Sequence, residues 1–199
     1  MSRLEERVRH LFGLSIETKI AVVDTIAASV ASAGQRLADC LLNDGKILIC
    51  GHGGSAANSF HFSSALLNQF EVERPSLPVI ALNADVAALT GVVDEGHADH
   101  LFARQINALG QEGDVLIALT TSGNSTGILR AIDAANDRGM YTVTLNGRDG
   151  GVLANHLGPD DIEIRVPGDT AARIREIHLF ILHSFCDLID QLLFGQIQD

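Results

Sequence analysis

The sequence predicts an α/β fold with five parallel strands, helices on both faces of the sheet and a helical arm ahead of it. Two observations lead to this prediction. Five short, almost wholly apolar segments recur along the 199 residues, and stretches with the apolar spacing of helices separate them. Apolar strands that alternate with helices are typical of a parallel sheet buried on both faces, with right-handed crossovers. No linker interrupts the pattern, so we expect one domain over residues 1–199.

The first 43 residues have apolar side chains at helical spacing, beginning with Leu4, Val8, Leu11 and Phe12. The spacing predicts two helices with a break near Gly34, and we assign this arm to oligomer contacts. The doubly wound core then occupies residues 44–199.

The five expected strands each end in a loop that leads toward a helix. One helix is expected to begin at Asp85, and another, after the third strand, to end at about Asp137. A short helix is expected after residue 151, and a long one from about Thr170 to Phe194. The strands are expected at Lys46–Cys50, Leu77–Leu82, Asp114–Leu119, Tyr141–Leu145 and Asp161–Val166. In open sheets of this kind, ligands bind beyond the carboxyl ends of the strands.

Composition narrows the class of protein. The formal net charge of −11 argues against a surface that grips a nucleic-acid backbone directly. No run of apolar residues approaches the roughly 18–20 needed to span a bilayer. Three cysteines without a CxxC pair fit buried thiols in a reducing compartment. We therefore expect a soluble, cytoplasmic protein with no membrane and no direct nucleic-acid partner.

A loop rich in hydroxyl groups follows the third expected strand, with Thr120, Thr121, Ser122 and Ser125 within six residues. These hydroxyls and the free N–H groups of the next helix favour a bound phosphate or carboxylate. The alternative is that Ser125 only caps the helix and the other hydroxyls fill the loop.

A glycine loop, Gly51–Ser55, follows the first expected strand in the same way and contains Gly53 and Gly54. A glycine turn before a helix is common, so this loop alone is a weak signal. It lacks the GxGxxG spacing of a dinucleotide site and the GK[ST] of a P-loop.

Several segments in order carry a resemblance to a known family. They are residues 51–62 (GHGGSAANSFHF), 73–78 (ERPSLP), 121–125 (TSGNS) and 161–167 (DIEIRVP). The chain resembles the SIS (sugar isomerase) domain family, in the branch that holds phosphoheptose isomerases (GmhA) and the DnaA initiator-associating protein (DiaA). The resemblance implies a flavodoxin-like sandwich with a five-stranded sheet and a homotetramer. It also implies a phosphorylated sugar held by Thr120, Thr121, Ser122 and Ser125, with Ser55 and its glycine loop nearby.

The isomerases of this family use a His and a Glu one helical turn apart, with a Gln and a His on the last helix, and these four can ligate zinc. Here His61 and His183 match the two histidines, and they are the candidate catalytic remnant. The Glu position is Ala65 and the Gln position is Arg175. Without the Glu, we expect the two histidines to be hydrogen-bonded near a subunit contact and retained by descent, with a working catalytic pair as the alternative. We expect Arg175 to form an exposed ion pair with Glu176 or Asp169, with a ligand phosphate as the alternative partner. A guanidinium cannot ligate a metal and repels it. No cofactor is expected, with zinc on His61 and His183 as the alternative.

These departures lead us to expect a regulator rather than an enzyme. In that hypothesis the chain is a DiaA-like tetramer that keeps a phosphosugar site, has lost isomerase activity and binds the replication initiator DnaA. Leu193 and Phe194 would then form part of the partner-binding patch, or alternatively a contact within the tetramer. The alternative function is a phosphoheptose isomerase for lipopolysaccharide heptose synthesis. A third possibility is a sugar-phosphate sensor.

Overall fold

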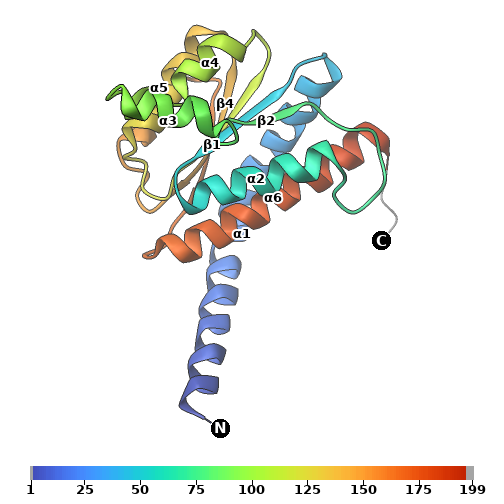
Figure 1. Cartoon of the computed structure of the whole chain (residues 1–199). Coiled ribbons are helices and arrows are strands. Elements are labelled where there is room, and N and C mark those ends of the chain that lie inside the picture. Colours follow the sequence, from blue (N-terminus) through green and yellow to red (C-terminus); the bar gives the residue numbers. More distant parts are fainter. Residues whose placement is uncertain (1, 196–199) are drawn as a thin grey trace.

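The computed structural model describes residues 2–195 and shows a five-stranded parallel sheet in the order β2-β1-β3-β4-β5, with helices on both faces (Figure 1). The fold class is therefore confirmed. The strand bounds are close to those expected, and β4 runs on to Gly147 because Gly147 pairs with Val166 of β5. The strands are β1 (Ile47–Gly51), β2 (Val79–Ala81), β3 (Val115–Leu119), β4 (Tyr141–Gly147) and β5 (Ile162–Val166).

The apolar strands feed two separate cores. Successive side chains of a strand point to opposite faces of the sheet. Ile47 and Ile49 of β1 accordingly enter one core, while Leu48 and Cys50 enter the other. Every residue of β1 and β3 is buried, which explains why these strands are continuous apolar runs rather than alternating ones.

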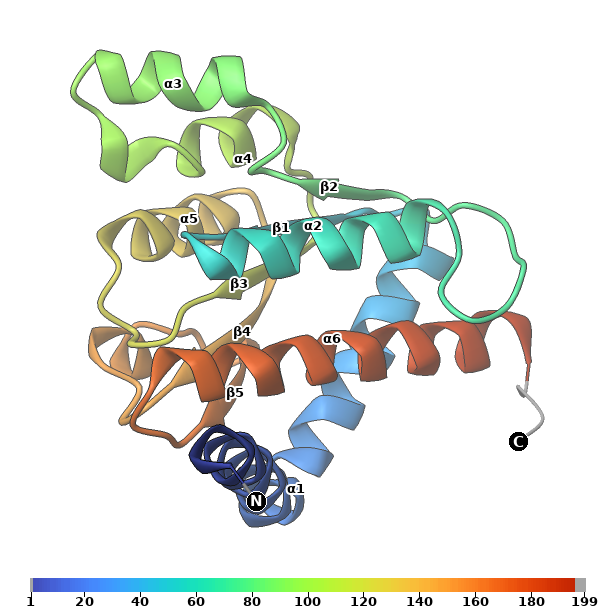
Figure 2. The same cartoon turned by 60° about the horizontal axis from the view of Figure 1, so that its bottom comes forward.

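Three helices cover the first face and two cover the second (Figure 2). The first face carries α1 (Arg3–Leu42), α2 (Gly54–Leu67) and α6 (Ala171–Phe194), and the second carries α4 (Ala103–Leu109) and α5 (Thr126–Asp137). The short α3 (Val86–Asp94) packs against the 3-10 turn Ala98–His100, which lies on α5. A second 3-10 turn, Val152–Asn155, follows β4.

The expected break near Gly34 is wrong, because α1 is one continuous helix of 40 residues. Gly34 is buried where α1 meets α6, and a Cβ atom there would lie 2.6 Å from Cδ1 of Leu188. The glycine therefore permits the two helices to approach closely and does not end the first one. The amino-terminal half of α1 projects away from the sheet as an arm (Figure 1).

Among residues 2–195, one helix, α6, is long and apolar enough to cross a bilayer by length and composition alone. Nine residues of α6, among them Ile174, Ile181 and Phe185, are buried, and these three pack in the first core, whereas Phe180 is exposed. The hydropathy of α6 is therefore explained by its place at the centre of the fold.

The strand order places a crevice between β1 and β3. From β1 the chain moves outward to β2, then returns across β1 to β3 on its other side. The parallel register pairs Gly51 with Leu119, so the loops that follow these two strands begin at the same edge of the sheet. This change of direction is the usual ligand position in open α/β sheets.

Candidate functional site

The glycine loop turns the chain tightly from β1 into α2. Gly53 has φ +57° and precedes the helix, and Gly54 is its first residue. A Cβ atom at Gly51 would lie 2.7 Å from Cβ of Ser55, so glycine is required where the helix folds back on the strand. Ser55 is buried, and its backbone N–H donates to the carbonyl of His52. The predicted residues Gly53, Gly54 and Ser55 thus stand together at the carboxyl edge of the sheet.

The hydroxyl loop lies beside it, after β3. The Thr120 hydroxyl oxygen accepts hydrogen bonds from the N–H groups of Ser122 (3.4 Å) and Gly123 (3.2 Å). Ser125 caps α5, since its oxygen accepts from the N–H of Ile128 at 3.4 Å. Within the described chain, the hydroxyls of Thr121 and Ser122 have no hydrogen-bond partner. Two of the four hydroxyls therefore hold the loop in shape, and two are free to meet a ligand.

Glycines also fix the back wall of the hydroxyl loop. Gly123 has φ +66°, and a Cβ atom there would lie 1.8 Å from the carbonyl oxygen of Gly150. The same oxygen accepts a hydrogen bond of 2.8 Å from the side chain of Asn146, at the end of β4. Sequence reasoning missed Asn146, because its role depends on a contact between two loops.

His52 is a second residue that sequence reasoning gave no role. Its ring packs on Phe102, with centroids 4.9 Å apart. Its Nε2 atom would lie 2.9 Å from a Cβ atom at Gly127, so His52 reaches from the glycine loop to the first turn of α5. Burial lowers the pKa of His52, which keeps the ring neutral at pH 7. The only signal in the sequence was its position in the glycine loop.

The two candidate catalytic histidines meet across α2 and α6. His61 Nε2 lies 2.7 Å from His183 Nε2. A contact of this length needs a proton on one ring and a free lone pair on the other, so at least one ring is neutral. Burial lowers the pKa of His183, the charge of His61 lowers it further, and Glu71 opposes them. The pairing suits proton transfer, because it keeps an acceptor and a donor side by side.

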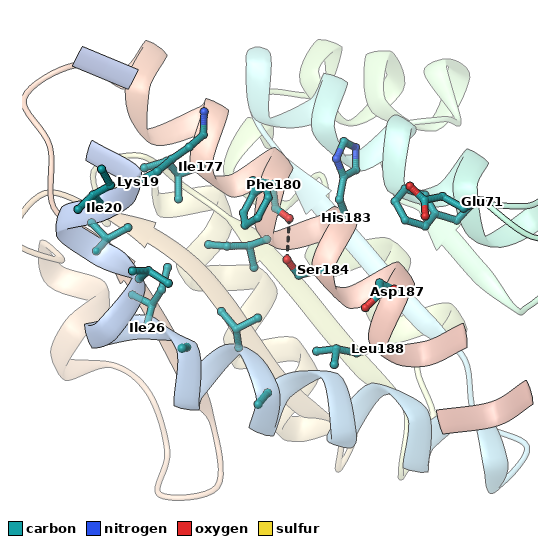
Figure 3. Close-up of a pocket in the computed structure, with 17 residues that line it drawn as sticks. Lys19, Ile20, Ile26, Glu71, Ile177, Phe180, His183, Ser184, Asp187 and Leu188 are labelled. Atoms are coloured by element: carbon teal, nitrogen blue, oxygen red, sulfur yellow. Dashed lines mark hydrogen bonds between the residues drawn. The ribbon is translucent and has the colours of Figure 1, made fainter. Parts of the chain in front are cut away.

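His183 also stands at the rim of an apolar groove between α1 and α6 (Figure 3). The groove has a volume of about 700 Å³, and Ile20, Ile26, Ile177 and Phe180 are among the residues that line it. His183 thus contacts His61 and also borders the apolar groove, which the described chain leaves uncovered.

The donor set at this place does not fit zinc. Ala65 is 8% exposed, belongs to the first core and offers no ligand atom. Arg175 cannot ligate a metal. Within residues 2–195 no cluster of three or more His, Cys, Asp or Glu side chains could hold a metal ion. Two imidazoles are fewer than the three or four ligands of a protein zinc site.

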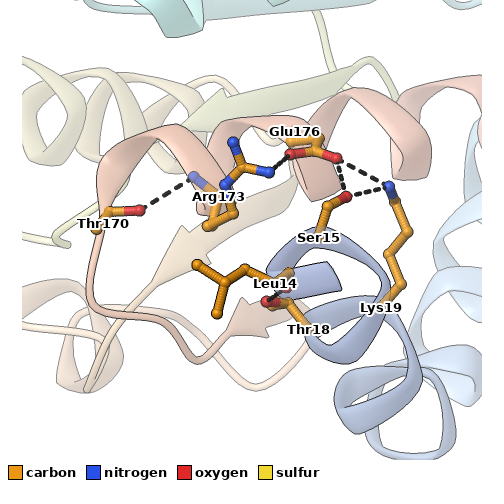
Figure 4. Close-up of polar contacts among 7 residues, drawn as sticks. All are labelled: Leu14, Ser15, Thr18, Lys19, Thr170, Arg173 and Glu176. Carbon is orange, nitrogen blue, oxygen red and sulfur yellow. Dashed lines mark hydrogen bonds and ion pairs between the residues drawn. The ribbon is translucent and has the colours of Figure 1, made fainter. Parts of the chain in front are cut away.

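The expected pairing of Arg175 with Glu176 or Asp169 does not occur in the structure. Figure 4 shows why for Glu176: its carboxylate is bound by Ser15 and Lys19 of α1 and by Arg173. The Lys19 contact is 2.9 Å and the Arg173 contact is 2.5 Å. Arg173, two residues before Arg175, forms the ion pair with Glu176 that was expected of Arg175.

A family model described as the SIS domain matches residues 15–147. The chain belongs to the SIS domain family. Two curated relatives place this SIS chain in the phosphoheptose isomerase branch. The phosphoheptose isomerase of Halorhodospira halophila is 56% identical over 96% of both chains. That of Chromohalobacter salexigens is 50% identical over 96% of this chain and 97% of the relative.

Solved structures agree with this placement. A phosphoheptose isomerase from Francisella tularensis has a TM-score of 0.91 and 44% identity, covering 96% of this SIS chain and all of the other. The phosphoheptose isomerase GmhA from Neisseria gonorrhoeae has a TM-score of 0.89 and 40% identity, covering 94% of this chain and 99% of the other.

The expectation of a DiaA-like regulator of replication is therefore wrong. Relatives at about half identity over the full length, and structures of the same fold, are phosphoheptose isomerases. The replacement of two side chains, Ala65 and Arg175, does not outweigh similarity over the whole chain. DnaA is therefore no longer the partner expected at Leu193 and Phe194. Leu193 packs partly against the first core and Phe194 is exposed, and the alternative that they form a contact within the tetramer stays a prediction.

Proposed function

We propose that this SIS protein is a phosphoheptose isomerase, which interconverts sedoheptulose 7-phosphate and D-glycero-D-manno-heptose 7-phosphate. The observation that carries the proposal is the contact of 2.7 Å between His61 and His183 on two helices that also lead away from the phosphate loops. The relatives named phosphoheptose isomerase support the choice of reaction.

The proposed phosphate site consists of the glycine loop and the hydroxyl loop. The unpartnered hydroxyls of Thr121 and Ser122 and the N–H groups at the start of α5 supply hydrogen-bond donors to a phosphate. Ser55, Gly53 and Gly54 form the other side of the crevice between β1 and β3. Anchoring the phosphate there leaves the carbonyl end of the sugar to extend along α2 and α6.

The reaction moves one proton from C1 to C2 of the sugar. A base removes a proton from C1, the C1–C2 double bond forms, and the C2 carbonyl oxygen takes up a proton to become a hydroxyl. The C1 hydroxyl then loses its proton and becomes the aldehyde, while the double bond takes up a proton at C2. In our proposal the neutral ring of the His61–His183 pair takes the proton and the protonated ring supplies one. The lowered pKa of His183 suits it to the role of base at pH 7.

Turnover of sedoheptulose 7-phosphate by the purified protein tests this proposal. Replacing His183 by Ala is expected to lower the rate about 100- to 10,000-fold, which is the usual contribution of a general acid or base. The control is His97→Ala, because His97 is exposed and its ring makes no hydrogen bond within the described residues. No turnover in the unaltered protein, or equal rates for the two variants, contradicts the proposal.

We further propose that the protein acts in the cytoplasm as a homotetramer. Supporting this assembly are the exposed apolar side chains along the arm of α1, which a monomer leaves in water. They are Leu4, Val8, Phe12, Ile16, Ile20 and Val23. Sedimentation equilibrium gives the mass directly, and Phe12→Asp is expected to weaken the assembly. A monomeric mass for the unaltered protein at micromolar concentration contradicts it.

A further inference from the structure

Arg175 lies directly on the first residue of α2. A Cβ atom at Gly54 would lie 2.8 Å from Cδ, 3.0 Å from Nε and 3.2 Å from Cζ of this arginine. Gly54 belongs to the glycine loop at the crevice, whereas His183 lies eight residues further along α6. Arg175 therefore stands between the phosphate loops and the histidine pair. The carbonyl of Arg175 accepts a hydrogen bond of 3.0 Å from Asn58, which holds α6 in place beside α2.

The guanidinium of Arg175 is not used by the fold. No ion pair of the described chain includes it, and its Nε atom is buried without a hydrogen-bond partner. The neighbouring acid, Glu176, already has three partners from α1 and α6 (Figure 4). A buried donor without a partner is costly, so such groups are usually satisfied by something the protein binds.

The charge of Arg175 also acts on its surroundings. It adds to the effect of burial in lowering the pKa of His178, one turn along the helix, to about 4. Since His178 is then neutral at pH 7 and Arg173 is paired with Glu176, Arg175 carries the positive charge of this stretch of α6 that has no ion-pair partner within the described residues. Planar guanidinium groups bind phosphate and carboxylate oxygens with paired hydrogen bonds.

We infer that Arg175 is a substrate-binding residue whose guanidinium binds an anionic oxygen of the sugar phosphate beside Gly54, and whose charge excludes divalent cations from the site. The inference rests on the proposed function in taking the ligand to be a sugar phosphate. In this chain a permanent cation of the protein stands where the family resemblance puts a metal ligand. The histidine pair consequently transfers protons without a metal between its two rings.

Isothermal titration of the full chain with zinc chloride, inorganic phosphate and sedoheptulose 7-phosphate tests the inference. Arg175→Gln is expected to weaken both phosphate ligands about 10- to 100-fold, because a hydrogen bond to a charged group is lost. The same change is expected to tighten zinc binding on the order of a hundredfold, because a like charge is removed. Arg175→Lys keeps the charge without the planar fork, so it continues to exclude zinc but binds sugar phosphate less tightly.

Arg173→Gln is the matched control, because Arg173 is on the same turn but already paired with Glu176. It is expected to change neither zinc nor phosphate affinity. One zinc ion bound per unaltered chain as tightly as by Arg175→Gln overturns the inference, as does unchanged sugar-phosphate affinity in that variant. If phosphate binding depends on Arg175 but sedoheptulose 7-phosphate is not converted, the proposed function fails and the inference stands. If the unaltered chain binds neither phosphate ligand, both fail.

Discussion

The two ends of the candidate site are made in different ways. At the phosphate end, backbone groups and short hydroxyl side chains are held by glycines such as Gly123, where any larger residue meets the backbone of Gly150. At the histidine end, individual long side chains from α2 and α6 meet, and two positions, Ala65 and Arg175, differ from the family pattern described above.

This difference shows which part of the site can change freely. A loop whose shape depends on close backbone contacts tolerates few substitutions, so it stays recognisable. A side chain on a helix surface can be replaced without altering the helix, so new chemistry arises there first. Under the proposed function, the same fold would hold the phosphate in the same loops while the side chains at the histidine end change.

The largest expected effect comes from adding a methyl group at the phosphate end. Gly123→Ala combines φ +66° with a contact of 1.8 Å to a backbone oxygen, neither of which can relax. We expect the free energy of unfolding to fall by about 3 kcal/mol or more, measured by urea unfolding, and phosphate affinity to fall more than about 100-fold.

The matched control for this change is Gly113→Ala, which has φ +88° but nothing within 4 Å of the added atom. It is expected to cost about 1 kcal/mol from backbone strain alone and to leave phosphate affinity unchanged. Equal losses of stability in the two variants refute the idea that close backbone contact shapes the phosphate end.

The next effect concerns His178, which joins the two ends. It lies on α6, and its Nε2 atom bonds the carbonyl of Asn146 behind the hydroxyl loop at 2.9 Å. Burial lowers its pKa from 6.5 to about 4, so the folded state binds fewer protons than the unfolded state between these values. Above pH 6.5, neutral His178 makes its full contribution to the free energy of unfolding. About 3 kcal/mol is lost as the pH falls to 4.

Urea unfolding at pH 7 and pH 4.5 measures this loss. His178→Gln keeps a donor of similar reach without a group that titrates, so its stability is expected to change less over the same interval. If both proteins lose stability equally on acidification, His178 is not the source.

A smaller effect is expected at Thr120, whose hydroxyl oxygen holds the loop through two backbone N–H groups. Thr120→Val leaves those donors without their acceptor and is expected to cost about 1 to 2 kcal/mol. Phosphate affinity should fall about tenfold as the loop loosens, while Thr120→Ser restores both quantities. Titration with inorganic phosphate distinguishes the variants, and an unaffected Thr120→Val would assign the loop's shape to the glycines alone.

The smallest effect belongs to the histidine end. Asn58→Ala removes the hydrogen bond that ties α2 to the carbonyl of Arg175, at a cost of about 1 kcal/mol. Turnover is expected to fall several-fold because the two helices carry the histidine pair, whereas affinity for inorganic phosphate falls less, because only the contact with Arg175 is loosened. A loss of phosphate affinity equal to the loss of turnover would show that the two ends are not separable.

Local patterns predicted the strands, and the positions of the loops that follow them, well. The runs before Gly51 and Thr120 are buried on both faces, and a run of this kind is visible without knowing its neighbours. The predicted break at Gly34 was wrong because a glycine is needed there to make room for Leu188 of α6. Leu188 lies far away in the sequence, so local pattern cannot reveal this contact.

The chemistry of the site depends on such distant contacts throughout. Arg175 is left unpaired because Ser15 and Lys19, near the other end of the chain, bind Glu176. Asn146 acquires its role from Gly150 across a loop. Sequence reasoning singled out His61 and His183, whose rings are in contact in the structure, but not which polar groups around them remain free.

The continuous helix α1 has a hydrodynamic consequence. At about 1.5 Å per residue, its 40 residues extend for roughly 60 Å. A compact domain of 199 residues has a radius of gyration of about 16 Å, so the helix is longer than such a domain is wide. A single protomer therefore has higher friction than a sphere of its mass. In small-angle X-ray scattering the pair-distance distribution of such a protomer has a long tail. In an assembly that packs the arms inward, the maximum distance is smaller for a given mass.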